Sequence, residues 1–387
     1  MNDKVIYLDN NATAPLHPEV LEAMMPYLKE KYGNASSIHF KGREAKKGLE
    51  GSRTILGDAL GTESVDIIFT SGGTESDNFA IKGVAFANKA KGNHIITSSI
   101  EHLAVGATCK YLESHGFKIT FLPVDKYGVV DLNALKDAIT PKTILVSIMH
   151  ANNEVGTIQP IKEIVKIVKA KGIYFHTDAV QSFGKIPVDV EELGVDLLSL
   201  SAPKINGPKG VGLIYVRKGV KIDPVNHGGH HERSLRAGTE NVPGIVGFAK
   251  AAQIAKRHMK EEPERLRKLR EMLHKGLTDR LGGVHLNGHP TERLPGTLNL
   301  SFQGVEGESL LINFDQKGIC GSTGSACTAG SNEPSHVLVA MKTAPQLAQG
   351  SVRFSLGIFN TEEEIAYCIE EIPRIAKRLR DISPFKK

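Results

Sequence analysis

The sequence has no long apolar run, and this absence argues against an integral membrane protein. No stretch approaches the roughly 18 to 20 consecutive apolar residues that a membrane-spanning helix needs. The first ten residues contain an acid, Asp3, and no apolar segment of the kind that a secretory signal carries. We therefore expect a cytoplasmic protein that has no membrane partner.

The sequence also has little net charge and few cysteines. The formal net charge is only +5 over 387 residues, and the basic residues are interspersed with acids, so a nucleic-acid partner is not indicated. The four cysteines, Cys109, Cys320, Cys327 and Cys368, form no CxxC pair and no spacing with histidine that is typical of zinc. We expect them to be thiols, and we expect no metal in the resting protein.

What remains is an ordinary globular composition, 40% apolar and 24% charged, with a length that suggests two or three domains. Short apolar stretches alternate with segments of helical periodicity. This alternation predicts an α/β domain around a mostly parallel sheet, with a ligand where the strands end. The expected strands are residues 66–70, 94–98, 118–124, 143–149, 174–177, 196–200 and 211–216.

The pattern changes near residue 261, which predicts a second and smaller α+β domain. We expect residues 15–260 to form the large domain, and residues 1–14 with 261–387 to form the small one. A charged segment at 264–275 is expected to be a solvated helix. Two strands at 297–302 and 352–356 and a last helix at 361–380 complete the expected small domain.

A glycine-rich turn, Ser71 to Ser76, follows the first expected strand of the sheet and precedes a helix. Glycines at such a place let backbone N–H groups approach an anion, and a helix N-terminus favours negative charge. A phosphate site is one interpretation. The other is a plain strand-to-helix turn with Thr74 or Ser76 as the N-cap.

Two further residues lie at the ends of apolar strands. Asp178 ends one of them, and an acid there is costly to bury unless it has a partner such as a protonated heterocyclic nitrogen. The alternative is a loop acid that caps the next segment. Lys204 follows another strand, in a loop rich in glycine and proline. A lowered pKa there would let its amine attack a carbonyl, although most loop lysines have no lowered pKa and attack no carbonyl.

Together, the turn, Asp178 and Lys204 match the pyridoxal-phosphate enzymes of the aspartate-aminotransferase fold, fold type I. That cofactor needs a phosphate anchor, a carboxylate that keeps its ring nitrogen protonated, and a lysine that binds its aldehyde. This combination is far more specific than any one of its parts.

Ordered motifs from about residue 6 to 380 narrow the class further. The chain resembles the cysteine desulfurases of the NifS/IscS class, in the class V aminotransferase family. The motifs that carry the resemblance are Tyr7-Leu8-Asp9-Asn10-Asn11-Ala12-Thr13, Asn34-Ala35-Ser36-Ser37-Ile38-His39, Gly72-Gly73-Thr74-Glu75-Ser76, Glu101-His102, Asn152-Asn153-Glu154-Val155-Gly156, His176-Thr177-Asp178-Ala179-Val180-Gln181, Arg236-Ala237-Gly238-Thr239-Glu240-Asn241-Val242-Pro243 and Gly324-Ser325-Ala326-Cys327.

The resemblance implies a role for each member of a cofactor and substrate site. The expected phosphate ligands are Gly73, Thr74 and Ser201, with Thr239 supplied by the partner subunit of a homodimer. For the ring, it implies that His102 stacks on it and shuttles protons, Asp178 pairs with its nitrogen, Gln181 with its hydroxyl, and Lys204 with the aldehyde. For L-cysteine, it implies that Arg353 grips the carboxylate with help from Asn11, while Asn152 lies near the ring hydroxyl and the substrate.

Cys327 is the implied nucleophile. It lies in a loop of small polar residues, at about 320–333, which we expect to move so that the thiol can reach the substrate sulfur and carry it outward. A free thiol has a pKa near 8.5, so a cationic neighbour must help to ionise it. The three other cysteines are expected to be core residues.

The resemblance implies a sulfur acceptor of the iron–sulfur scaffold class, where Cys327 is a candidate for a transient cluster ligand. Two alternatives stay open. One is another enzyme of the same fold, an aminotransferase or a selenocysteine lyase, which would not need Cys327. The other is a catalytically weak assembly factor, because Pro203 stands where the family usually has a histidine before the lysine.

Overall fold

The computed structural model describes residues 5–323 and 334–383, and a seven-stranded sheet organises most of the chain. All its strands are parallel except β8, which runs antiparallel to both of its neighbours. The predicted α/β fold with a mostly parallel sheet is confirmed. In order across the sheet, the strands are β2 (Ile67–Thr70), β8 (Gly212–Val216), β7 (Leu197–Ser201), β6 (Tyr174–Asp178), β5 (Thr143–Ser147), β3 (His94–Ser98) and β4 (Lys118–Leu122).

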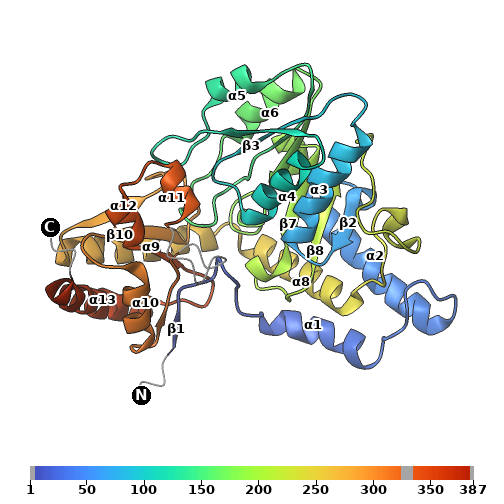
Figure 1. Cartoon of the computed structure of the whole chain (residues 1–387). Helices are drawn as coiled ribbons and strands as arrows, with labels where there is room; N and C mark the ends of the chain where they lie inside the picture. The colour runs from blue at the N-terminus through green and yellow to red at the C-terminus, as the bar shows by residue number, and fades with distance from the viewer. Residues whose placement is uncertain (1–4, 324–333, 384–387) are drawn as a thin grey trace.

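Helices cover both faces of this sheet, because its central strands are apolar on both sides (Figure 1). On one face, α3 (Gly73–Ala87) and α4 (Leu103–Glu113) pack on a core that includes Phe79, Val105 and Leu112. The helices that bury residues in the larger core on the other face are α1 (Pro18–Lys29), α2 (Phe40–Leu60), α5 (Leu132–Ala138), α6 (Ile161–Lys169), α7 (Val190–Leu193) and α8 (Val242–His258), with α11 (His336–Ala340) and α12 (Pro345–Gln349) from the C-terminal part of the chain.

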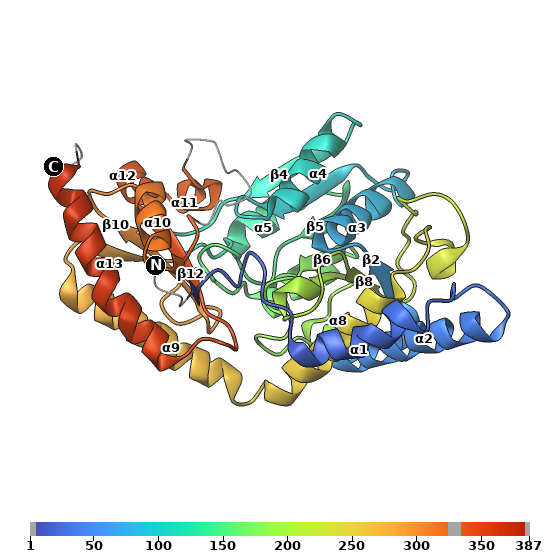
Figure 2. The ribbon, with the colours of Figure 1, turned by 90° about the horizontal axis from the view of Figure 1, so that it is seen from below.

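A separate hydrophobic core joins the two ends of the chain. A short parallel pair, β1 (Ile6–Tyr7) and β11 (Ile319–Cys320), lies beside a three-stranded antiparallel sheet. Figures 1 and 2 show this C-terminal part, in orange and red, at one side of the molecule. Its remaining elements are α9 (Glu262–Arg280), β9 (Val284–Asn287), β10 (Thr297–Phe302), α10 (Gly307–Asp315), α11 (His336–Ala340), α12 (Pro345–Gln349), β12 (Ser351–Ser355) and α13 (Glu362–Ile382).

The helix α9 differs from its prediction as a solvated helix. Leu266, Leu269, Leu273 and Leu277 recur at helical spacing and are buried in the second core, while the charged residues of the same segment are mostly exposed. The prediction followed the many charged residues of the segment and did not take the spacing of its leucines into account. The division into residues 15–260 and residues 1–14 with 261–387 stays a prediction. Within residues 5–323 and 334–383, no helix combines the length and the apolar character that crossing a membrane requires.

Candidate active site

The carboxyl ends of the parallel strands meet at one edge of the sheet, and a cavity of about 340 Å³ lies there. Nine of the residues named from the sequence line this cavity. They are Asn11, Gly73, Thr74, His102, Asp178, Gln181, Ser201, Lys204 and Arg353. The chain brings them together because β2, β6 and β7 end at the same edge of the sheet, with β8 between β2 and β7, while residues 11 and 353 come from the two ends of the chain.

One end of the cavity is formed by the N-terminus of α3. Its N-cap is Gly72, with φ +153° and no side-chain capping bond. A Cβ on Gly73 would lie 2.7 Å from Cγ2 of Val180, so only glycine leaves the helix end open here. The hydroxyl of Ser76 bonds to the backbone oxygens of Gly72 and Leu213 instead of capping the helix. This geometry favours an anion cradle over a side-chain-capped turn.

Two buried carboxyls lie further inside. Asp178 Oδ1 accepts a hydrogen bond from the Val180 backbone N–H at 2.8 Å, and burial raises the pKa of this acid. Asp77 is 1% exposed, and its Oδ1 atom has no hydrogen-bond partner in the described part of the chain. Burial lowers the pKa of neighbouring His176 to about 3, so that ring is neutral and does not balance the two acids. The pair therefore favours a cation in the cavity.

Lys204 and His102 supply the proton-carrying groups of the cavity. Lys204 ends the short 3-10 helix η2 (Ala202–Lys204), directly after β7, and its Nζ atom donates to the Ala12 carbonyl. His102 is the N-cap of α4, where its Nδ1 atom accepts a hydrogen bond from the Ala104 N–H at 3.1 Å. Because Nδ1 is an acceptor, the neutral ring carries its proton on Nε2.

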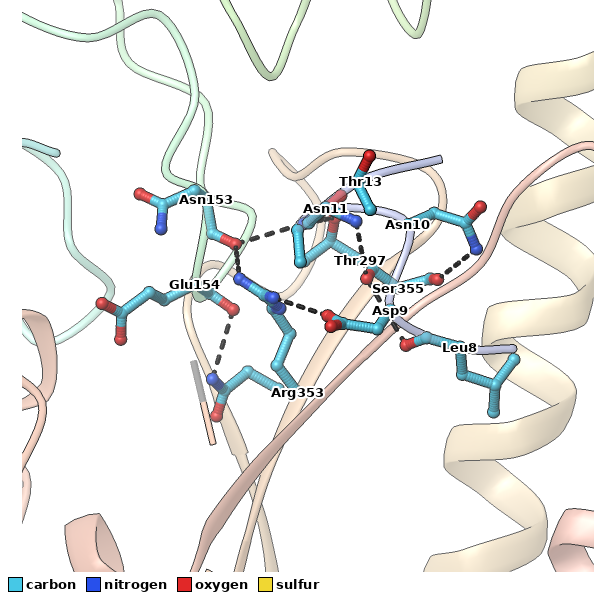
Figure 3. Close-up of polar contacts among 12 residues, drawn as sticks. Leu8, Asp9, Asn10, Asn11, Thr13, Asn153, Glu154, Thr297, Arg353 and Ser355 are labelled. Carbon is cyan, nitrogen blue, oxygen red and sulfur yellow. Dashed lines mark hydrogen bonds and ion pairs between the residues drawn. The ribbon is translucent and has the colours of Figure 1, made fainter. Parts of the chain in front are cut away.

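Arg353 lines the cavity from β12, and Figure 3 shows its contacts with Asp9 and Asn153. Its Nη2 atom lies 2.7 Å from Asp9 Oδ1, and its Nη1 atom donates to the Asn153 carbonyl at 2.9 Å. The Nε atom is buried and has no hydrogen-bond partner in the described residues. Asn11 lies beside it and donates through Nδ2 to Thr297 Oγ1 and to the Asn153 carbonyl. This corner is suited to a carboxylate, although Arg353 Nη1 and Nη2 and the Nδ2 atom of Asn11 already have acceptors.

Three residues predicted for the site are not part of the cavity lining. Asn152 is fully buried behind it, with Nδ2 bonded to the Ile100 carbonyl and Oδ1 to the N–H groups of Glu154 and Val155. Thr239 is exposed, in the loop that precedes α8. Cys327 lies outside the described residues.

The other cysteines fit a structural role to different degrees. Cys109 and Cys368 are fully buried, and burial raises the pKa of each thiol to about 12. Cys320 is only half-buried, at the end of β11. Thiols with raised pKa values are poor nucleophiles, because the thiolate is the reactive form.

Sequence reasoning missed several lining or contacting residues. Asp77 follows the glycine-rich turn by one helical turn, and this spacing from Gly73 on an expected helix was a usable signal. Asn153 contributes its backbone carbonyl, and Asp9 contributes a carboxylate from an N-terminal segment with no strong periodicity. These two contacts depend on how the chain ends meet, which local sequence does not encode.

The residues present fit pyridoxal phosphate. The open end of α3 suits its phosphate, the two unbalanced acids suit its protonated ring nitrogen, and Lys204 suits its aldehyde. A cavity of about 340 Å³ lies within the range of small-molecule sites.

Comparisons with known proteins agree with this chemistry. The aminotransferase class-V family profile matches residues 6–368. Cysteine desulfurase IscS of Methanosarcina thermophila is 55% identical over 382 residues, which cover 99% of this chain and 94% of the relative. The IscS of Dictyoglomus turgidum is 56% identical over 382 residues, covering 99% of this chain and 97% of the relative.

Solved structures give the same result. A NifS-like protein superposes with a TM-score of 0.92 at 44% identity, covering 97% of this chain and all of the other. A NifS-like protein from Rickettsia africae gives a TM-score of 0.86 at 36% identity, with the same coverage. The chain therefore belongs to the aminotransferase class-V family and, within it, to the pyridoxal-phosphate-dependent cysteine desulfurases of the IscS type.

Proposed function

We propose that this protein converts L-cysteine to L-alanine and keeps the sulfur as a persulfide on Cys327. The observation that supports the proposal is the grouping of Lys204, Asp178 and Arg353 around one cavity that also receives the open N-terminus of α3. A carbonyl-binding amine, a ring-nitrogen partner and a carboxylate partner are the groups that a pyridoxal-phosphate enzyme acting on an amino acid requires.

The cofactor would be held by residues of this chain and one of its partner. Gly73, Thr74 and Ser201 would bind the phosphate, with the partner subunit's Thr239 completing the cradle. Asp178 would hold the proton of the ring nitrogen, and Gln181 would donate to the ring hydroxyl. When bound, pyridoxal phosphate supplies an aldehyde for amines and a ring that withdraws electrons from the substrate carbon.

The substrate would be oriented by its carboxylate. Arg353 would bind it, and Asn11 would stabilise that corner, while Asn152 would act from behind the wall by fixing the backbone at Glu154 and Val155. Lys204 Nζ and His102 Nε2 would exchange protons with the substrate carbons. Their closeness in one cavity makes both roles compatible.

The sulfur transfer balances as a simple exchange. The Cys327 thiolate forms a bond to the substrate sulfur, and the substrate bond between Cβ and sulfur breaks. Its electron pair stays with the carbon skeleton, which takes up protons and leaves as alanine. The net change is one thiol and one cysteine giving one persulfide and one alanine, with no external oxidant or reductant.

The persulfide would be passed to an iron–sulfur scaffold protein in the cytoplasm. The relatives named cysteine desulfurase support the first part of this route, the removal of sulfur from cysteine. Cys327 would then contact the scaffold and serve as a transient cluster ligand during transfer. A homodimer follows from the role assigned to Thr239 in the partner's site.

The test compares Cys327→Ala with Cys320→Ala, a thiol on the half-buried strand β11. Cys327→Ala should abolish persulfide and sulfide formation while the visible absorbance of the bound cofactor stays. Cys320→Ala should keep both. Lys204→Ala should lose the visible absorbance band that a lysine-bound cofactor gives.

Persistent sulfide formation by Cys327→Ala would contradict the nucleophile assignment and favour a selenocysteine lyase or aminotransferase. A colourless wild-type protein that still binds a scaffold would favour an assembly factor. Pro203 is compatible with either result, because its backbone carbonyl still accepts a hydrogen bond from the Ala14 N–H at 2.8 Å, whereas proline has no backbone N–H of its own to donate.

A further inference from the structure

A second lysine, Lys185, lies close to the site and has no role in the mechanism above. It follows Gly184, whose φ of +74° belongs to the left-handed region that glycine adopts without strain. A Cβ on Gly184 would approach Cγ2 of Ile205 to 2.6 Å, so the turn cannot easily carry another residue. Lys185 lines a smaller cavity of about 70 Å³ that also borders Asn11 and Lys204. The turn thus directs this lysine to the back of the active site.

The ammonium group contacts two amides of the site. Its Nζ atom donates to Asn11 Oδ1 and to Gln181 Oε1, each at 2.9 Å. A lysine ammonium has three donors and no acceptor, whereas an amide has an oxygen at one end and a donating nitrogen at the other. Lys185 therefore selects one of the two orientations of each amide, with the oxygen facing the lysine.

This choice decides what Gln181 offers to the cavity. Its Nε2 atom uses one N–H to donate to the Asn11 backbone oxygen at 2.9 Å. An amide nitrogen has two N–H groups, so the second is left for the cavity that Gln181 lines. The reverse orientation would place an acceptor where the ring oxygen of the cofactor, itself an acceptor, has to bind.

Asn11 is fixed in the same way. With Oδ1 on Lys185, its Nδ2 atom donates both of its hydrogens, to Thr297 Oγ1 at 2.9 Å and to the Asn153 carbonyl at 3.2 Å. Asn11 is therefore locked between the lysine and the wall that carries Arg353. It stabilises the carboxylate corner through position and has no spare N–H for the substrate.

Lys185 is not held by an ion pair with a carboxylate in the described part of the chain. Burial is the largest cause that lowers its pKa, the cations Lys204 and Arg353 act in the same direction, and together they bring it to about 7. In the described part of the chain, Lys185 Nζ donates to two amide oxygens, and Glu262, which borders the same small cavity as His258, is paired with Arg265. A neutral amine still has two N–H groups, so both contacts survive loss of the third proton.

We propose that Lys185 is a positioning residue that holds the side-chain amides of Gln181 and Asn11 in one orientation, so that Gln181 presents an N–H to the ring oxygen of the cofactor. The inference rests on the proposed function, since that function assigns the ring oxygen to Gln181. Burying an amine near two cations, with only neutral acceptors, costs more free energy than burying a methionine of similar size. The presence of lysine here therefore points to a role for its N–H groups.

The experiment measures the pH midpoint of the change in visible absorbance of the bound cofactor, in the absence of substrate. A ring oxygen that has lost its donor holds nearby protons more tightly, so Lys185→Met should raise the midpoint by about one pH unit. Lys185→Arg keeps a donor-only side chain and should restore a midpoint close to that of the wild type. Lys171→Met, at an exposed site in the turn after α6, is the matched control and should change nothing.

A second comparison separates orientation from a direct effect of charge. In a Gln181→Ala background, Lys185→Met should leave the midpoint unchanged, because the amide through which it acts is gone. An equal shift in both backgrounds would overturn the proposal. If Lys185→Met does not fold, as judged by thermal unfolding of the cofactor-free protein, Lys185→Gln takes its place in the same cycle.

The outcomes distinguish this inference from the function beneath it. A wild-type protein that binds no cofactor overturns the proposed function. A coloured and active wild type with an unshifted Lys185→Met midpoint overturns only the positioning role of Lys185.

Discussion

Arg353 and Asp9 form an ion pair inside the carboxylate corner, with Nη2 and Oδ1 2.7 Å apart (Figure 3). The arginine side chain is 3% exposed and the aspartate side chain 19% exposed, so the acid lies on the open side of the pair. The carboxylate of Asp9 thus occupies one of the two positions where a substrate carboxylate would make a forked contact. In the proposed function, substrate binding at Arg353 would therefore exchange one carboxylate for another.

Asp9→Asn should lower the KM for L-cysteine by about tenfold, because Arg353 no longer has to release a charged partner. The same change should lower the free energy of unfolding by about 2 kcal/mol, since the buried guanidinium loses a charged acceptor. Steady-state kinetics and urea unfolding measure the two effects. Asp137→Asn, at an exposed position of α5, should alter neither. A raised KM would show that Asp9 orients Arg353 instead of competing for it.

A second buried ion pair holds a loop outside the carboxylate corner. Arg53 and Glu232 meet through two hydrogen bonds of 2.7 Å and are 3% and 2% exposed. Glu232 begins a run of three non-glycine residues with positive φ, in the 3-10 helix η3 (His231–Ser234). The pair holds this strained run in place.

Glu232→Ala should lower the free energy of unfolding by about 3 kcal/mol, because it removes the buried carboxylate of the pair and leaves the buried Arg53 guanidinium with the half-exposed carboxylate of Glu50. Glu191→Ala breaks an exposed ion pair with Arg217 and should cost about 1 kcal/mol or less. Urea unfolding compares the two. Equal losses would mean that the Arg53 pair contributes no more than a surface pair.

The sheet could be predicted because its strands are short, continuous apolar runs bounded by turn residues. Residues 94–98 and 143–147 are buried at every position, so their periodicity is that of strands covered on both faces. The charged helix α9 could not be assigned correctly from charge alone, because its leucine stripe becomes meaningful only when a second core is present.

The site was predictable where one local segment carries the chemistry, as at Gly73, Asp178 and Lys204. It was not predictable where a contact joins distant segments. The pairing of Arg353 with Asp9 and the contact of Lys185 with Asn11 arise from folding the chain ends onto the sheet edge. Asn152 was expected near the cofactor ring from a local motif, but in the structure its side chain bonds to backbone groups behind the cavity wall.

The proposed homodimer can be tested separately. The protein should sediment at twice the chain mass of 41.9 kDa. Thr239→Val should weaken cofactor binding by about tenfold, as expected for one lost hydrogen bond to a charged group. When Lys204→Ala and Thr239→Val subunits are mixed, sites of wild-type affinity should reappear, because one site of each mixed dimer then has both residues intact. If Thr239 acted within its own subunit, no such site could form.

The last prediction concerns Glu101, a buried acid beside the site. It is 4% exposed, accepts a hydrogen bond from Ser98 Oγ at 2.5 Å, and receives the Met149 N–H on both oxygens at 3.1 Å. The pKa of Glu101 is raised from 4.5 to about 8, and burial is the largest cause. Between these values the folded protein holds a proton that the unfolded chain has lost. Stability therefore falls as the pH rises through this window.

Glu101→Gln removes this proton uptake and should flatten the pH dependence. Relative to the variant, the wild type should lose on the order of 1.4 kcal/mol for each pH unit between about pH 5 and pH 8. Urea unfolding of the cofactor-free protein across that range measures the difference, and Glu113→Gln, at an exposed position of α4, is the matched control. Parallel curves for wild type and Glu101→Gln would mean that the acid is already charged in the folded protein, and the two donors at Met149 and Ser98 would then outweigh its burial.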